Sequence, residues 1–132
     1  MPDVNMLAVL LCAVSSLVLG GIWYSPALFA KPWQRAAGLS EERAASGNLV
    51  MIFSLSFLLS LIAAFLFAMF LGREFGLGPS IAAGASAGLC WVAASFGINY
   101  LFERRPLRLW LINGGYHTLQ FTLFGLILGL MH

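Results

Sequence analysis

The residues whose types and spacing could do chemistry in this 132-residue chain are polar side chains within its last two long apolar segments. In the final segment they recur every three or four residues, which places them on one face of a helix. Amides, hydroxyls and an imidazole can together bind a polar solute through hydrogen bonds, and an imidazole can also exchange a proton near neutral pH. The predicted ligand-binding residues are Ser95, Asn99, Asn113, Tyr116, His117 and Gln120.

The same polar stripe could instead be a packing network between helices. An unpaired polar side chain in hydrocarbon costs roughly 2 kcal/mol or more, so these groups need partners. Hydrogen bonds between membrane helices contribute about 0.6 kcal/mol each. Because a short turn joins the last two apolar segments, we expect Asn113 to lie level with Ser95 and Asn99. The sequence leaves a solute site and a packing network both open.

Other chemistry has weaker support in the sequence. Cys12 and Cys90 lie far apart, and neither His117 nor His132 has another ligand at a metal-binding spacing. We therefore expect no metal and no cofactor, although a haem held by two copies of His117 across a dimer stays open. No nucleophile and base are spaced to act together, so we expect that the protein is not an enzyme.

The elements that must position these residues are long and apolar. Charged residues make up 9% of the chain and the mean hydropathy is +0.91, whereas soluble domains are about 25% charged. Four segments reach the roughly 20 residues that cross a hydrocarbon core. We predict an all-α integral membrane protein, a four-transmembrane-helix bundle in which residues 1–132 form a single domain. The helices are expected at about residues 4–24, 49–71, 81–102 and 107–131.

Small residues form a further pattern in the last two expected helices. A Gly-x-x-x-Gly spacing lets the backbones of two membrane helices approach closely. The predicted helix-packing or oligomer contacts are Gly84, Gly88, Gly114, Thr118, Gly125 and Gly129. Because one bundle of four helices is narrow, we expect a homo-oligomer or a subunit of a larger membrane complex.

The connection between the first two expected helices predicts an amphipathic segment at the membrane interface. Pro26 ends the first helix, and Trp33 alternates with Lys31 and Arg35. Residues 40–42, a serine followed by two glutamates, predict a helix start ahead of the second span. The predicted interfacial residues are Trp23, Tyr24, Pro26 and Trp33.

The basic residues predict the orientation in the membrane. Six of the seven lie in two connections, at Lys31, Arg35, Arg43, Arg104, Arg105 and Arg108. The positive-inside rule places these two connections in the cytoplasm, and both termini and the turn around Arg73 outside, in the periplasm. The net charge is only +2, so we infer no nucleic-acid partner, and the expected partner is the lipid bilayer.

Several motifs resemble a known family when they are taken together and in order. They are Trp23-Tyr24-Ser25-Pro26, Gly38-Leu39-Ser40-Glu41-Glu42, Leu101-Phe102-Glu103-x-Arg105 and Leu111-Ile112-Asn113-x-Gly115-Tyr116. With them the chain resembles, almost end to end, the bacterial membrane family catalogued as domain of unknown function 1761. The resemblance implies a four-helix protein of the bacterial inner membrane. It brings no established reaction, substrate or cofactor.

Two functions follow from these observations. The first is an oligomeric small-molecule binding or transport protein, with a polar site between the third and fourth expected helices. The alternative is a non-catalytic structural or accessory subunit that docks on a larger membrane complex through the glycine stripe of the last helix and the amphipathic segment near Trp33.

Overall fold

The computed structural model describes residues 4–40, 42 and 48–131, which form helices and short connections without a β-strand. The helices are α1 (Met6–Trp23), α2 (Ala30–Ala37), α4 (Leu49–Leu71), α5 (Leu77–Ala87), the π-helical segment η1 (Gly88–Ala93), α6 (Ala94–Glu103) and α7 (Leu107–Leu130). The all-helical prediction is confirmed for this part of the chain. The helix start expected at residues 40–42 is not tested here, because residue 41 and the following residues 43–47 lie outside the described residues.

Three helical stretches within the described residues are long and apolar enough to cross a membrane. They are Met6–Trp23, Leu49–Leu71 and Leu77–Glu103. The 24-residue α7 is long enough as well. Polar side chains along its middle lower its mean hydropathy, so it is not among the three. A crossing by α7 therefore requires that protein cover those side chains.

Local sequence explains where the helices begin. The Asn5 side chain accepts hydrogen bonds from the backbone N–H groups of Leu7 and Ala8, at 3.1 and 3.2 Å, and so caps α1. Asn48 caps α4 in the same way through the N–H of Met51, at 3.0 Å. Each cap satisfies backbone donors that the first turn of a helix leaves without a partner.

The third expected helix starts at Leu77 rather than near residue 81. Pro79 lies in its first turn, where the missing N–H of proline removes no helical hydrogen bond. Gly72 ends α4 with a φ of +71°, a conformation that suits glycine, and Arg104 ends α6 with a φ of +57°. The turn around residues 72–76 is therefore shorter than the sequence suggested.

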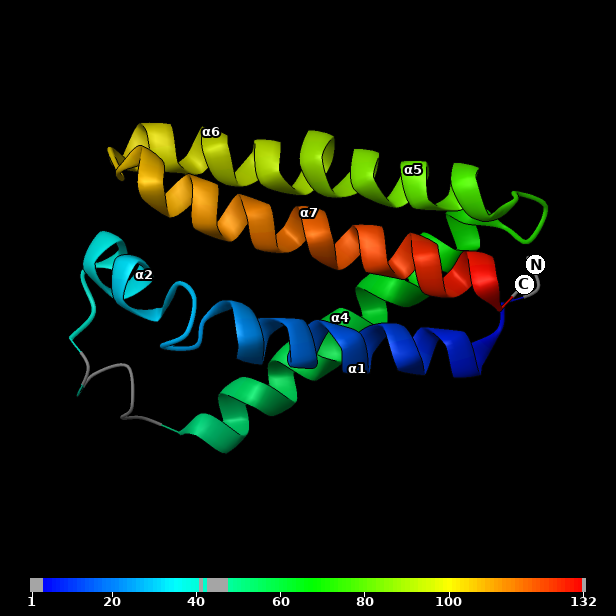
Figure 1. Ribbon diagram of the computed structural model, residues 1–132, viewed down its shortest axis with the longest axis horizontal. Helices are drawn as coiled ribbons and strands as arrows, with labels where there is room; N and C mark the ends of the chain where they lie inside the picture. Colours follow the sequence, from blue (N-terminus) through cyan, green and yellow to red (C-terminus); the bar gives the residue numbers. More distant parts are fainter. Residues whose placement is uncertain (1–3, 41, 43–47, 132) are drawn as a thin grey trace.

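The central element of the fold is α7. It packs along α5 and η1 on one side and along α1 on another, and it also contacts α2 and α6. Figure 1 shows α5 and α6 in one continuous rod beside α7, while α4 crosses α1. The start of α1 and the end of α7 lie at the same end of the bundle, where Asn5 Nδ2 donates a hydrogen bond to the carbonyl of Met131 at 2.8 Å.

The buried core lies where α1, α4 and α7 meet. Small alanines from α1 and α4 let these helices approach, and larger side chains from α7 fill the space between them. The members of this core are Ala8, Val9, Cys12, Ala64, Ala68, Leu71, Phe124 and Leu128.

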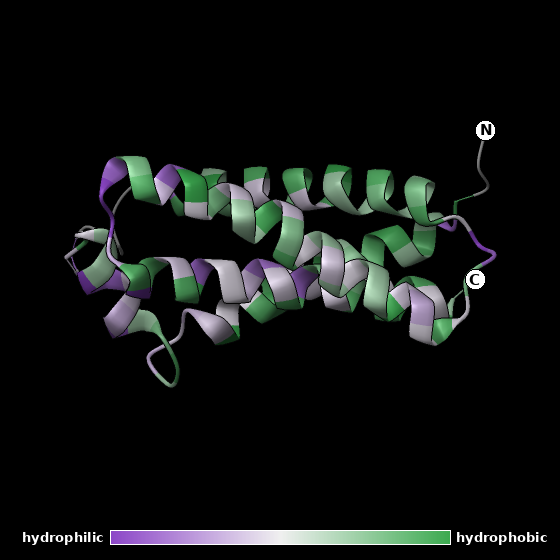
Figure 2. Cartoon of the chain, turned by 90° about the horizontal axis from the view of Figure 1, so that it is seen from above, coloured by the Kyte–Doolittle hydropathy of each residue, from purple (hydrophilic) through white to green (hydrophobic). Residues whose placement is uncertain are grey.

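The outer surface is strongly apolar. Leu101 and Phe102 are each 80% exposed, Phe70 is 87% exposed and Trp91 is 72% exposed. Figure 2 shows hydrophobic residues over most of the length of the helices, with hydrophilic residues near the helix ends and a few in the middle of the bundle. A continuous apolar surface of this kind is typical of a protein that is surrounded by lipid.

The segment η1 interrupts the regular α-helix between α5 and α6. A π-helical turn contains an extra residue relative to a regular α-helix. The indole Nε1 of Trp110, on α7, donates a hydrogen bond to the carbonyl of Ala93 at 2.8 Å. This contact fixes the end of η1 against α7.

Candidate functional site

The glycine face of α7 contacts α5 so closely that no side chain fits between them. A Cβ atom on Gly84 would collide with the backbone carbonyl of Phe121. A Cβ atom on Gly125 would collide with the backbone carbonyl of Ser80. These glycines therefore allow the two backbones to touch, as the Gly-x-x-x-Gly spacing predicts.

The other small residues of this pattern also lie inside the chain. A Cβ atom on Gly88 would lie 2.7 Å from the carbonyl oxygen of His117, and one on Gly129 would lie 3.1 Å from the nearest side-chain atoms of α5. A Cβ atom on Gly114 would lie 3.3 Å from that of Ala93. The Thr118 hydroxyl donates to the Gly114 carbonyl of its own helix, at 2.8 Å. The glycine face is thus covered within the chain.

The polar face of α7 begins with Asn113, which joins two other elements. The Tyr24 hydroxyl, just beyond α1, donates a hydrogen bond to Asn113 Oδ1 at 2.6 Å. Asn113 Nδ2 in turn donates to the hydroxyl oxygen of Tyr100 on α6, at 2.8 Å. Burial raises the pKa of the Tyr24 hydroxyl, and Tyr116 and Tyr100 raise it further, so this hydroxyl stays a protonated donor.

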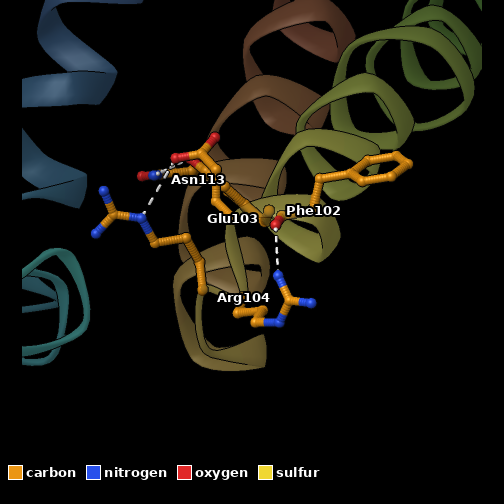
Figure 3. A network of polar contacts seen from close by, with 6 residues as sticks. Phe102, Glu103, Arg104 and Asn113 are labelled. Atoms are coloured by element: carbon orange, nitrogen blue, oxygen red, sulfur yellow. Dashed lines mark hydrogen bonds and ion pairs between the residues drawn. The ribbon is translucent and has the colours of Figure 1, made fainter.

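Figure 3 shows the surroundings of Asn113 at the turn between α6 and α7. The Arg104 guanidinium reaches back to the carbonyl of Phe102, at 3.4 Å. Arg105 and Glu103 form an exposed ion pair of 3.5 Å. The tight turn thereby brings Tyr100 and Asn113, which are 13 positions apart, into direct contact.

A second group of hydrogen bonds on this face centres on Ser16 of α1. The Tyr116 hydroxyl donates to the Ser16 carbonyl at 2.9 Å. Gln120 Nε2 donates to the Ser16 hydroxyl at 3.0 Å, and both residues are buried. Gln120 Oε1 lies 2.7 Å from His117 Nδ1, so that nitrogen carries the proton in this arrangement.

Aromatic contacts surround His117. Its ring stacks on Phe96 of α6, with centroids 5.0 Å apart and an angle of 13° between the rings. Tyr116 meets His117 edge-on, with centroids 4.8 Å apart. The imidazole is therefore packed between α6 and α7 and held by Gln120, which fixes its orientation.

The structure brings together four of the six predicted ligand-binding residues: Asn113, Tyr116, His117 and Gln120. We define them, with Ser16, Tyr24 and Tyr100, as the polar cluster. Ser95 and Asn99 do not belong to it, because both are exposed on α6. The Ser95 hydroxyl donates to the Trp91 carbonyl of its own rod, at 2.6 Å. The polar cluster thus lies mainly between α1 and α7, not between the third and fourth expected helices alone.

The extra residue in η1 explains this difference. A regular helix would put Gly84, Gly88, Trp91, Ser95 and Asn99 on one side. One additional residue turns all later positions by about 100°. After Gly88, the residues that contact α7 include Ala93, Phe96, Gly97 and Tyr100, while Trp91 points outward.

Sequence reasoning missed three members of the polar cluster, namely Ser16, Tyr24 and Tyr100. Ser16 shares a face of the first helix with other small residues, and this pattern is the sequence signal that could have identified it as a contact residue. Tyr24 and Tyr100 each follow a Gly-Ile-x motif at the end of an apolar segment. Nothing in that motif specifies Asn113 as their common partner.

The predicted interfacial residues contact other parts of the chain. Trp23 Nε1 donates to the carbonyl of Ile112 on α7 at 2.9 Å, and its ring packs on Phe29 with centroids 4.7 Å apart. Trp33 of α2 packs edge-on against Tyr24, with centroids 5.1 Å apart. Pro26 is exposed in the turn between α1 and α2. Their location at a membrane interface stays a prediction.

The polar cluster is closed by its own hydrogen bonds. Among the described residues, every buried side-chain nitrogen and oxygen has a hydrogen-bond partner. Two hollows in the described part of the chain, one beside α4 and a smaller one beside Arg73, include no residue of the cluster. In this arrangement the cluster is a hydrogen-bonded contact between α1, α6 and α7.

The larger hollow is an apolar groove between α4 and the rod formed by α5 and η1. Its volume is about 480 Å³. Aromatic and aliphatic side chains form most of its walls, with Phe67 and Phe70 from α4, Trp91 from η1 and Phe121 from α7. The lining residues with polar side-chain groups are Ser86 and Cys90.

Metal ligands do not gather in the described residues. No group of three or more His, Cys, Asp or Glu side chains there is placed to hold a metal ion. Cys12 is buried and Cys90 is exposed, and both are free thiols.

Comparison with known proteins gives one match. A family model described as Protein of unknown function (DUF1761) matches residues 7–129. No curated protein and no solved structure matches the chain. The matched range contains the aromatic-Ser-Pro motif at residues 23–26 and the motif at residues 111–116, on which the resemblance rested. The chain therefore belongs to the DUF1761 family.

Proposed function

We propose that the protein is a multi-pass protein of the bacterial inner membrane that binds a small apolar or amphipathic molecule in the groove between α4 and α5. The observation that carries this proposal is the groove itself. Its volume of about 480 Å³ falls within the roughly 300–1,000 Å³ of small-molecule sites. Its apolar walls select a ligand that partitions into the membrane.

The polar cluster has a different role in this proposal. Its hydrogen bonds are already made within the chain, so a polar solute would have to break several of them to enter. The cluster instead holds α1, α6 and α7 in place and covers the polar face of α7. That cover supports a fourth membrane crossing by α7, whose 24 residues span about 36 Å.

The distribution of charge supports the orientation predicted from the sequence. Lys31, Arg104 and Arg108 belong to the end of the bundle that holds α2 and the turn between α6 and α7. Arg73 lies at the opposite end, where it lines a small hollow together with Asn5 and Met131. By the positive-inside rule the first end faces the cytoplasm.

A topology measurement checks this orientation. We expect alkaline phosphatase fused after Met131 to be active, because that end lies in the periplasm, and green fluorescent protein at the same position to be dark. The matched control is a pair of fusions after Gly38, which should give the opposite result. A fluorescent C-terminal fusion would overturn the orientation.

The groove is tested by filling it. Ser86 is an exposed residue of α5 that lines the groove, whereas Ala82, one turn earlier, is exposed outside it. We expect native mass spectrometry of gently extracted protein to show a reproducible small-molecule mass. Ser86→Trp should reduce the bound fraction about tenfold or more, and Ala82→Trp should leave it unchanged. Equal retention of the mass in both variants would refute the groove as the site.

One observation favours a second function, as a structural or accessory subunit or a homo-oligomer. The first half of α4 is largely exposed, with exposed fractions of 78% at Val50, 58% at Phe53 and 65% at Leu59. Docking through the glycine face of α7 is unfavourable, because α5 already covers that face. The same mass spectra separate the two functions, since stoichiometric masses of other subunits would favour docking through α4.

A further inference from the structure

One end of the bundle carries a concentrated positive charge. Lys31 and Arg35 on α2 are exposed, and so are Arg104, Arg105 and Arg108 around the turn between α6 and α7. Figure 1 shows α2 and this turn at the same end of the molecule. We define these five residues as the basic end.

Acidic residues offset only part of this charge among the described residues. Glu103 lies in the turn, where its carboxylate is 3.5 Å from Arg105 Nε, and Glu42 follows α2. The Arg104 guanidinium donates a hydrogen bond to the carbonyl of Phe102, at 3.4 Å. The basic end is therefore left with an excess of cationic side chains that face outward.

Exposed apolar side chains directly border these charges. Leu101 and Phe102 are both 80% exposed, Leu107 is 68% exposed and Leu111 is 57% exposed. In the sequence these apolar residues stand before, between and after Arg104, Arg105 and Arg108. The surface thus presents cationic groups next to a face suited to hydrocarbon.

We infer that the turn between α6 and α7 binds an anionic phospholipid, with its phosphate on Arg104, Arg105 and Arg108 and an acyl chain along Leu107 and Leu111. Guanidinium groups match phosphate oxygens through paired hydrogen bonds, which favours arginine for this task. The apolar border selects a lipid over a soluble anion, because a free phosphate would gain nothing from it. Basic residues close to a membrane are attracted to its anionic lipids. This inference rests on the proposed membrane insertion and is independent of the groove.

The test is lipid binding to the purified full-length chain by native mass spectrometry, with phosphatidylglycerol and phosphatidylcholine offered in equal amounts. We expect phosphatidylglycerol to be retained about tenfold more. The triple variant Arg104→Gln, Arg105→Gln, Arg108→Gln should lose most of this preference. Arg73→Gln is the matched control, because it removes a positive charge at the opposite end, and it should retain the preference.

The inference would be overturned by equal retention of both lipids by the unmodified chain, by an unchanged preference in the triple variant, or by an equal loss in Arg73→Gln. Competition by millimolar inorganic phosphate would show a soluble-anion site instead. If the triple variant does not fold, Arg108→Gln alone should lower the preference about threefold, and no change would equally refute the site. Ser86→Trp should bind phosphatidylglycerol normally, which separates this result from a failure of the groove.

Discussion

Replacing Gly125 by alanine is expected to lower the free energy of unfolding by about 3 kcal/mol. The added Cβ atom would collide with the backbone carbonyl of Ser80, and a backbone cannot move aside as a flexible side chain can. The helices α5 and α7 would have to separate along their whole contact. Overpacking of a well-packed interface costs about 1–3 kcal/mol, and a backbone collision belongs at the upper end.

The measurement is reversible unfolding of the purified protein from mild-detergent micelles into sodium dodecyl sulfate, followed by circular dichroism. Gly21→Ala is the matched control, because Gly21 lies inside α1 and has open space where a Cβ would stand. Alanine is the better helix former, so this control should be neutral or stabilising by up to about 1 kcal/mol. Equal stability of Gly125→Ala and the unmodified protein would show that α5 and α7 do not touch at this position.

Replacing Asn113 by leucine is expected to lower the free energy of unfolding by about 2 kcal/mol. Asn113 accepts from Tyr24 and donates to Tyr100, so leucine removes two hydrogen bonds that join three elements. Bonds of this kind contribute about 0.6 kcal/mol on average and at most about 1.7 kcal/mol. The Tyr24 hydroxyl also loses its acceptor while it stays partly buried, which adds a desolvation cost.

A double-mutant cycle with Tyr24→Phe isolates the contact. Tyr24→Phe alone should cost about 1 kcal/mol, and the double variant should be little less stable than Asn113→Leu, because the hydroxyl and its acceptor act as a pair. Asn99→Leu is the control, since Asn99 is exposed and lies outside the polar cluster. It should change stability by less than about 0.5 kcal/mol. Strict additivity in the cycle would contradict the hydrogen bond between Tyr24 and Asn113.

The sequence by itself determined the helices and the polar face of α7. The second long helix occupies Leu49–Leu71, the range expected from hydropathy, because an apolar run of this length has few other stable conformations in a membrane. Asn113, Tyr116, His117 and Gln120 share a face because positions three and four apart in one helix are always neighbours. Both features depend only on interactions that are close in sequence. The close packing at Gly84 and Gly125 also follows from a local pattern, because each of them is followed four residues later by a second glycine in the same helix.

Only the tertiary structure decided which groups these residues meet. The extra residue of η1 rotates α6, so Tyr100 contacts Asn113 while Ser95 and Asn99 face outward. Hydropathy and helical periodicity do not register a π-helical turn, because they assume that every residue turns the helix by the same angle of about 100°. The position of Ser16 opposite Gln120 and the groove beside α4 likewise depend on how whole helices are placed. That placement is set by contacts between distant parts of the chain, which no local pattern encodes.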